Sequence, residues 1–364
     1  FYKDSNYVAY ASPTQSAGDK VLNVGYENDP VFRALDGSSF NLSSLGVHDK
    51  PHESSTDNIV SFNDHYASSL WNVLPFSILN LPTWVSHLPT GYGDGMTRIL
   101  DSGFYEQMTR DSTVIVANLS DPARATTWVQ DLNRNAEAHK GNTFIIGSDG
   151  DDLIKGGRGA DFIEGGKGND TIDISQGITS GVINTEEGKD TFNWQSGTFA
   201  GEVNFAGTGG NNKANIGNVT LDKTRHITTE AGSGNALTFT NTHGNSAKIG
   251  SLSSDNLTTG TNIGTGWDSL TISGSSADMR IVDRLQLASK TIAVTNGATL
   301  RTGDHGESTS TAATIADYNV TTQGTGSRVI FDTQGDTTAA QIYNGVISGD
   351  GKFERAAGGT TVFT

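Results

Sequence analysis

An isoleucine recurs at every ninth position of segment 147–173, which reads GSDGDDLIKGGRGADFIEGGKGNDTID. Three consecutive units follow the pattern G-G-x-G-x-D-x-U-x, where U is apolar, and Ser148 in place of the second glycine is the only departure. The apolar positions are Ile154, Ile163 and Ile172. Glycine permits a sharp turn with positive φ, and each isoleucine begins a short strand whose side chain points inward. The pattern therefore predicts stacked units that form a parallel β-roll.

Longer apolar runs precede this segment. Val21–Tyr26 (VLNVGY) and Thr113–Leu119 (TVIVANL) have the composition of buried parallel strands, and Thr127–His139 has apolar residues at helical spacing. This layout predicts an α/β segment, and because two strands do not make a sheet, further strands are expected upstream of Phe1. Trp71–Val85 is the most apolar stretch, but it is short and contains two prolines, so we expect a buried or lipid-surface segment.

After residue 173 the pattern changes to short alternating or apolar runs every fifteen to twenty-five residues. The runs include GEVNF, NVTL, ALTFT, SLTI, RIVDRLQL, TIAV, RVIF and YNGVI, and clusters of Gly, Asn and Asp separate them. Such strands are weak alone and bury their inward side chains on the next rung, so the pattern favours a parallel β-solenoid. A β-sandwich is the alternative, because its strand spacing overlaps.

Composition narrows the function classes. The 364 residues include 24 basic and 40 acidic ones, and the resulting net charge of -16 disfavours a nucleic-acid partner. Cysteine is absent, which excludes disulfides and thiol chemistry. The first ten residues lack the basic start and apolar core of a signal peptide, and the chain begins without Met, so we expect a fragment.

The aspartates of the repeats predict a calcium site. Carboxylates combined with turn carbonyls form the hard oxygen environment that calcium prefers. One coil of the roll uses two nonapeptides, so Asp152 and Asp170 should face one ion, whereas Asp161 needs a partner outside the perfect run. The candidate ligands in this segment are Asp149, Asp151, Asp152, Asp161, Asn169 and Asp170. The alternative is a glycine-rich acidic linker; calcium-dependent order, lost on chelation, would distinguish the two.

The first half of the chain resembles a known family. The stretches VLNVGYENDPVFRALDG, NIVSFNDHYASSLWNVLPFSILNLPTWVSHLPT and DSTVIVANLSDPARATTWVQDLNRNAE, followed by the nonapeptides, are similar to the calcium-dependent bacterial lipases of subfamily I.3 from about Phe1 to Ile172. The resemblance implies a secreted triacylglycerol hydrolase with an α/β-hydrolase domain followed by an RTX β-roll. It also implies an ester lipid at an interface as substrate, calcium as cofactor and export by bacterial secretion machinery.

The resemblance implies a Ser-His-Asp triad. Its acid falls on Asp29 of ENDPVF and its base on His87 of TWVSHLP. Serine is a weak nucleophile until histidine takes its proton, while the aspartate orients the imidazole. The nucleophile in a G-x-S-x-G elbow is absent from these residues and expected upstream, so the chain alone should not hydrolyse esters. From the residues alone, His65 is an equally plausible base.

The resemblance also implies a calcium site within the hydrolase segment. Its side-chain ligands fall on Asp57 in HESSTDN and Asp111 in TRDSTV, with carbonyls around His52 and Ser55. Carboxylate and carbonyl oxygens suit calcium. The alternative is a turn or helix cap at Asp57 and a loop salt bridge at Asp111.

The second half resembles autotransporter passengers through GKDTFNWQSGTFAGEVNF and GVISGDGKFERAAGGTTVFT. We therefore expect an α/β-hydrolase part over 1–140, a calcium β-roll over 141–175 and a β-solenoid over 176–364, with Asp190 of GKDTF as a possible extension of the roll. The alternative function is a surface-displayed structural or adhesive module with a non-catalytic lipase-like portion. Either way, the expected location is secreted or on the outer-membrane surface of a Gram-negative bacterium. The resemblance changes from lipases to autotransporter passengers near residues 172–176. Both a natural fusion and a chimera joined there would explain this change.

Overall fold

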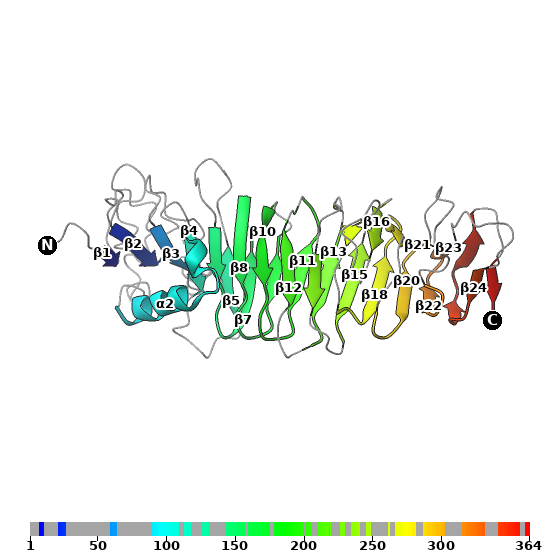
Figure 1. The fold of residues 1–364 in the computed structure, drawn as a ribbon. Helices are drawn as coiled ribbons and strands as arrows, with labels where there is room; N and C mark the ends of the chain where they lie inside the picture. Colours follow the sequence, from blue (N-terminus) through cyan, green and yellow to red (C-terminus); the bar gives the residue numbers. More distant parts are fainter. Residues whose placement is uncertain are drawn as a thin grey trace, which may run out of the picture. The chain divides into compact units, whose positions relative to one another are not determined.

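The structure is a computed structural model (Figure 1). It describes residues 7–10, 21–26, 59–63, 89–108, 113–117, 126–130, 143–156, 159–174, 178–197, 199, 201–205, 210–217, 219, 226–229, 234–240, 245–248, 261–262, 266–281, 287–302, 315–331, 341–356 and 361–364. The chain divides into two compact units, unit 1 over Phe1–Glu187 and unit 2 over Gly188–Thr364, and each is described by itself.

Unit 1 contains two parallel sheets. The first has, in order, β1 (Tyr7–Tyr10), β2 (Val21–Tyr26), β3 (Ile59–Asn63), β4 (Thr113–Ala117), β6 (Thr143–Ile146), β8 (Gly159–Glu164) and β10 (Ile178–Asn184). The second has β5 (Thr126–Gln130), β7 (Asp151–Lys155) and β9 (Thr171–Asp173). From β5 onward the chain alternates between the sheets, as a roll requires. The predicted strand at 21–26 and the predicted β-roll are confirmed, and the strand predicted over Thr113–Leu119 is confirmed over 113–117, the part that the structure describes.

The predicted helix over Thr127–His139 is wrong in its first turn. Residues 126–130 form strand β5, which pairs in parallel with β7 from Thr126 opposite Asp151 to Gln130 opposite Lys155. Two threonines and a valine in this segment favour an extended backbone. The neighbouring strand β7 supplies the hydrogen-bond partners that an extended backbone needs. Tertiary pairing therefore overrides the helical spacing; residues 131–139 lie outside the described residues.

Helix α2 (Pro89–Asp101) was not predicted from the sequence. Its three glycines lower the helix propensity of the segment. They therefore make the helical spacing of the apolar residues Tyr92, Met96 and Ile99 hard to recognise in the sequence. Pro89 suits the first turn, where its missing N–H costs nothing. Within the described ranges, no helix combines the length and apolar character needed to cross a bilayer.

The hydrophobic core of unit 1 joins α2 and the short 3-10 helix η5 (Tyr105–Gln107) to the first sheet. Tyr92, Ile99 and Phe104 pack with Val114, Val116, Phe144 and Ile146 in one buried cluster. The ring of Phe144 stacks on Phe162 with centroids 4.9 Å apart, and Phe104 meets Phe162 edge-on at 5.3 Å. The helical segment is thus held against strands of the roll itself.

Unit 2 is a parallel β-solenoid, as predicted. One sheet has β11 (Thr191–Trp194), β13 (Lys213–Ile216), β15 (Ala236–Thr240), β18 (Ser269–Ser273), β20 (Thr291–Thr295), β22 (Asn319–Gln323) and β25 (Ile347–Gly349). Another has β17 (Thr261–Asn262), β16 (Asn245–Lys248), β19 (Asp278–Ile281), β21 (Thr299–Thr302), β23 (Arg328–Phe331) and β26 (Lys352–Arg355). Two parallel pairs, β12 (Glu202–Phe205) with β14 (His226–Thr229) and β24 (Gln341–Tyr343) with β27 (Thr361–Phe363), complete the described strands.

The solenoid core consists of apolar columns in register. Leu237, Leu270, Ile292 and Val320 stand opposite one another on successive strands and are all buried. Each short strand covers the side chains of its neighbour, so the coils stabilise one another rather than folding singly. Within the described part of unit 2, the strands pair in parallel, which argues against the sandwich alternative.

A ladder of side-chain oxygens runs along one corner of this solenoid. The backbone N–H of Asp190 donates to Asn212 Oδ1 at 2.8 Å, that of Asn212 to Asn235 Oδ1 at 3.0 Å, and that of Asn235 to Asp268 Oδ2 at 2.8 Å. Asn212 and Asn235 are buried. Each coil therefore satisfies a buried donor of the preceding coil.

Replacing Asn235 with alanine should lower the free energy of unfolding of unit 2 by about 1–3 kcal/mol, because the buried N–H of Asn212 would lose its acceptor. Urea unfolding of the protein measures this loss. The matched control is Ser276→Ala, an exposed position that should change the value by less than about 0.5 kcal/mol. Equal stability of the two variants would contradict the role of the ladder.

Candidate calcium sites

Three turns stack at one edge of unit 1. They follow β6, β8 and β10 and begin at Gly147, Gly165 and Thr185. The N–H of Gly147 donates to Glu164 O at 2.7 Å, and the N–H of Gly165 donates to Asn184 O at 2.9 Å. Between neighbouring turns, the N–H of Lys167 donates to Ser148 O at 3.1 Å and that of Glu187 donates to Gly166 O at 3.0 Å.

The glycines of these turns adopt the backbone geometry that the repeat pattern predicts. Gly166 has φ of 97° and Gly168 has φ of 108°, a region in which other L-residues are strained. A Cβ atom on either glycine would lie less than 3 Å from backbone atoms of the preceding turn. The glycines therefore let successive turns approach closely enough to share a ligand.

The three repeat aspartates are all buried. Their exposed fractions are 1% for Asp152 and 0% for Asp161 and Asp170. The backbone N–H of Asp152 donates to Asp170 Oδ1 at 2.9 Å, so residues eighteen positions apart meet on neighbouring coils, as predicted. Asp161 is opposite Gly181 of β10, which lies outside the perfect repeats. Buried carboxylates need a compensating charge or hydrogen bonds.

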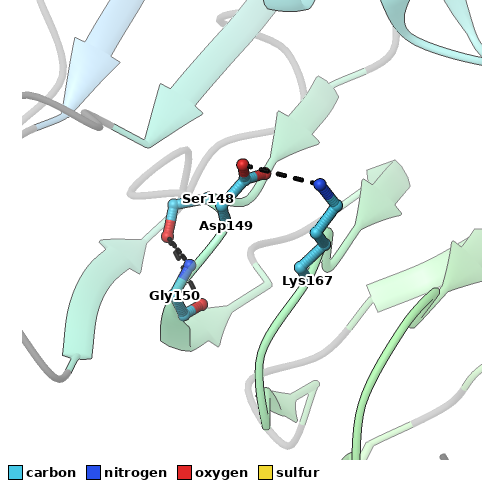
Figure 2. Close-up of polar contacts among 4 residues, drawn as sticks. All are labelled: Ser148, Asp149, Gly150 and Lys167. Carbon is cyan, nitrogen blue, oxygen red and sulfur yellow. Dashed lines mark hydrogen bonds and ion pairs between the residues drawn. The ribbon is translucent and has the colours of Figure 1, made fainter. Parts of the chain in front are cut away.

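The candidate ligands Asp149, Asp151 and Asn169 contact side chains or backbone of the neighbouring turn. Asp151 Oδ1 accepts hydrogen bonds from the backbone N–H of Asn169 at 2.7 Å and from its Nδ2 at 3.2 Å. Figure 2 shows Asp149 facing Lys167 on the next turn, with 3.8 Å between Oδ2 and Nζ. Asp149, Asn169 and Lys167 are exposed, so these pairs align neighbouring turns from outside and contribute little energy through charge.

Ser148 satisfies the carboxylate of its own turn. Its Oγ donates to Asp152 Oδ1 at 2.8 Å, and its backbone N–H donates to Asp152 Oδ2. The same Oγ accepts a hydrogen bond from the N–H of Gly150 at 3.1 Å, a contact seen in Figure 2. The one departure from the repeat pattern therefore gives the first turn an internal hydrogen-bond network.

Oxygen atoms converge beside two of the turn glycines. A Cβ added to Gly147 would lie 1.9 Å from Gly165 O and 2.8 Å from Asp152 Oδ2. A Cβ added to Gly165 would lie 2.5 Å from Thr185 O and 2.6 Å from Asp170 Oδ2. Each glycine thus lets a carboxylate of its own turn and a carbonyl of the next turn approach the backbone more closely than any side chain would allow.

This donor set fits calcium. Carboxylate and carbonyl oxygens are the ligands of a hard cation, and Asp161 Oδ1 and Asp170 Oδ2 are buried oxygen atoms that make no hydrogen bond within the described residues. Among those residues no three His, Cys, Asp or Glu side chains gather as a metal-binding group. The candidate ligands here are the carboxylates of Asp152 and Asp170 and the carbonyl oxygens of Gly165 and Thr185.

The turns are also linked to helix α2. The backbone N–H of Gly103, just after the helix, donates to Oε1 of the buried Glu164 at 2.8 Å. Burial lowers the pKa of Arg98 on α2, while the carboxylates of Asp152, Asp149, Glu164 and Glu186 oppose that shift. A cation of the helix therefore lies in the field of the turn carboxylates.

The remaining candidate residues lie outside the described residues. They are Asp29, His87, His65, Asp57, Asp111, His52 and Ser55, together with Trp71–Val85. Thr185, Glu164 and Arg98 were not predicted as site residues. The sequence does contain one signal for Thr185, because TEEGKD keeps the glycine and aspartate of the repeat at the fourth and sixth positions.

Comparison with known proteins agrees with this geometry. The family of the RTX calcium-binding nonapeptide repeat (4 copies) matches residues 139–172. Two lipases of Pseudomonas fluorescens are 93% identical over 149 residues and 85% identical over 150 residues. Each match takes in 41% of this chain and 31% or 33% of the relative, so the chain spans about a third of the length of these relatives.

Among solved structures, the extracellular lipase LipA from Serratia marcescens aligns with a TM-score of 0.40 and 34% identity, covering 85% of this chain and 56% of that one. The match of residues 139–172 to the calcium-binding repeat identifies the metal as calcium. Residues 139–172 are RTX repeats that bind calcium, in a chain that is similar to Pseudomonas fluorescens lipases over two fifths of its length.

Proposed function

We propose that this chain is part of a secreted triacylglycerol lipase whose β-roll orders when it binds calcium. The observation that carries the proposal is 93% identity over 149 residues to a lipase, combined with oxygen-lined turns at the matched repeats. Such identity over so long a segment supports a common activity for the whole proteins. The substrate is an ester lipid at an interface.

In this proposal the chain supplies two members of a Ser-His-Asp triad. His87 takes the proton of a serine from elsewhere in the whole protein, and Asp29 holds the imidazole in the correct tautomer. Asp57 and Asp111 bind a second calcium ion in the hydrolase segment, where carboxylates suit a hard cation. These four residues are assigned through the resemblance of their local motifs to subfamily I.3.

Calcium also connects the roll to export. Sites of the extracellular type bind with dissociation constants of about 10⁻⁴ to 10⁻³ M, far above the free calcium of a cytosol. The carboxylates of Asp152, Asp161 and Asp170 would then repel one another inside the cell and keep the roll unfolded. Binding outside would fold it. A chain without cysteine suits passage through secretion machinery, because no disulfide has to be avoided.

The complete enzyme tests this proposal through calcium-dependent ester hydrolysis. On a triacylglycerol emulsion we expect hydrolysis at about 1 mM calcium, loss of activity in EGTA with magnesium present, and recovery when calcium is returned. Fatty-acid release in a pH-stat is the readout. No hydrolysis in calcium would contradict the lipase assignment, and full activity in EGTA would contradict the dependence on calcium.

The solenoid of unit 2 favours a second candidate, a surface-displayed structural module. Its registered parallel strands form an extended scaffold of the kind used for display. In that case the lipase-like part would be non-catalytic. One experiment on whole cells distinguishes the two functions. Cells that expose unit 2 to an antibody but release no fatty acid from a triacylglycerol emulsion would favour the structural module.

A further inference from the structure

The exposed apolar side chains of unit 2 gather on one coil. Among the described residues of this unit, the large apolar side chains that are exposed are Ile342, Val346, Phe353, Val362 and Phe363. Strands β25, β26 and β27 of this coil each stand at an edge of their sheet (Figure 1). Exposed apolar patches of this kind mark interaction surfaces. We call the open side of these three strands the edge face.

Phe353 on β26 continues a column of core residues. It stands opposite Val329, which follows Leu300 and Met279 on the preceding strands. Those three side chains are fully buried, whereas 38% of Phe353 is exposed. A partner that covers Phe353 would remove apolar surface from water, as each coil does for its neighbour.

The backbone of β26 offers hydrogen-bonding groups on the same side. The N–H of Lys352 donates to Ser327 O at 2.8 Å, and that of Ala356 donates to Phe331 O at 3.1 Å. Neighbouring residues of a strand direct these groups to opposite sides, so the N–H and C=O of Phe353 face away from β23. Such an edge is a template for pairing with another chain.

We propose that the edge face binds a second copy of this chain, through antiparallel pairing of the two β26 strands about a two-fold axis at Phe353. Charge complementarity selects this register. Lys352 lies opposite Glu354 of the partner subunit at both symmetric contacts. An axis at Lys352 or at Glu354 would instead place that charge opposite itself, which is destabilising. An axis between two residues would bring the inward face of one strand against the outward face of the other.

The same axis brings the other two edges together. Strands β25 and β27 lie in different sheets from β26, and the rotation places β25 of one copy against β27 of the other. Ile347 of β25 and Phe363 of β27 continue the inward columns of the buried Val320 and Tyr343. A two-fold contact covers both edge faces and stops at the dimer. This inference goes beyond the proposed function and does not depend on lipase activity.

Sedimentation equilibrium of the full chain in calcium tests the proposal by charge exchange. The wild type should dimerise, and Lys352→Glu should raise the dissociation constant by about a hundredfold, because like charges then meet at both contacts. Adding Glu354→Lys to that variant should restore the dimer. Folding should not suffer, since Lys352 stands opposite Arg328 within the same chain. Lys213→Glu, the same change at an exposed position of the inner strand β13, is the matched control.

A disulfide tests the register directly. The chain has no cysteine, so Phe353→Cys introduces one thiol at the proposed axis. Opposite residues of a hydrogen-bonded antiparallel pair have Cα atoms about 5.5 Å apart, a distance that a disulfide spans. Mild oxidation should therefore give a covalent dimer, and Lys213→Cys should give none. Circular dichroism shows that each variant keeps the wild-type fold.

Three results would overturn the two-fold contact. The first is a wild-type chain that stays monomeric at every concentration. The second is a dimer that neither weakens with Lys352→Glu nor crosslinks with Phe353→Cys. The third is a series of assemblies larger than the dimer, because head-to-tail stacking of coils does not close. Weakening by Lys352→Glu, recovery with Glu354→Lys and crosslinking at position 353 together support it.

Discussion

Removing calcium should unfold residues 147–187 while the solenoid of unit 2 keeps its strands. The roll brings Asp152, Asp161 and Asp170 into its interior, and without a cation these carboxylates are buried at a large cost. Each calcium site contributes about 2.7 kcal/mol of stability at a calcium concentration one hundred times its dissociation constant. Two or more sites therefore account for much of the stability of a segment with such short strands.

We expect unit 2 to depend less on calcium, because Asn212 and Asn235 stand between the carboxylates of Asp190 and Asp268 in its ladder. Asn212 and Asn235 are buried at the corner of the solenoid and accept backbone hydrogen bonds without adding charge. Neutral acceptors need no metal ion. The two units thus satisfy the same kind of donor by different means, one with carboxylates and the other mainly with amides.

Hydrogen exchange followed by mass spectrometry checks the contrast strand by strand. In EGTA the amides of β7 and β9 should lose their protection, while those of β13 and β15 retain it. Magnesium at the same ionic strength is the control for screening. Protection of β7 and β9 that is equal with and without calcium would contradict the prediction, and simultaneous loss in both units would show that unit 2 depends on the roll.

The repeats were predictable because their signals are local. The turn glycines and the inward isoleucines recur in each unit, and Ile154, Ile163 and Ile172 are all fully buried. Strand β5 and helix α2 were not predictable in this way. The pairing partner of β5 is supplied by β7, and the glycine-rich α2 gains its stability from packing against the sheet.

The third turn was hidden by its spacing. Twenty residues separate Gly165 from Thr185, whereas a strict repeat requires eighteen. Strand β10 takes up the irregularity through a register shift between Ile178 and Ser180, and Gly181 follows with φ of 139°. Stacking is therefore preserved although the sequence period is lost. The repeat period alone does not bring Thr185 and Asp170 to neighbouring turns, because periodicity describes consecutive units and not insertions between them; the TEEGKD signal is local to the third turn.

The link between α2 and the roll joins calcium binding to the proposed triad. Helix α2 begins two residues after His87 in the sequence, and its other end is held by the hydrogen bond from Gly103 to Glu164. Glu164 belongs to β8, directly before the second calcium turn. A roll that loses its calcium would therefore release the element that follows the proposed base, which gives a physical route from metal binding to activity.

Replacing His87 with alanine in the complete enzyme should reduce kcat for ester hydrolysis by about a thousandfold or more, because the serine would lose the group that accepts its proton. His65→Ala is the matched control: it removes an equal side chain from the same segment and should retain activity near the parent level. Asp29→Asn should cost about ten-thousandfold, since an amide would favour the wrong imidazole tautomer.

Titration of fatty-acid release at saturating calcium measures all three variants, and calcium-dependent circular dichroism confirms that each remains folded. A large loss in His65→Ala with normal activity in His87→Ala would transfer the base to His65, which local sequence alone leaves equally eligible. Loss in both would indicate that one histidine acts on folding, and the variant whose KM and calcium requirement are unchanged would then be the base. Because α2 follows His87 directly, a folded His87→Ala variant that binds calcium normally would separate proton transfer from the structural coupling through Glu164.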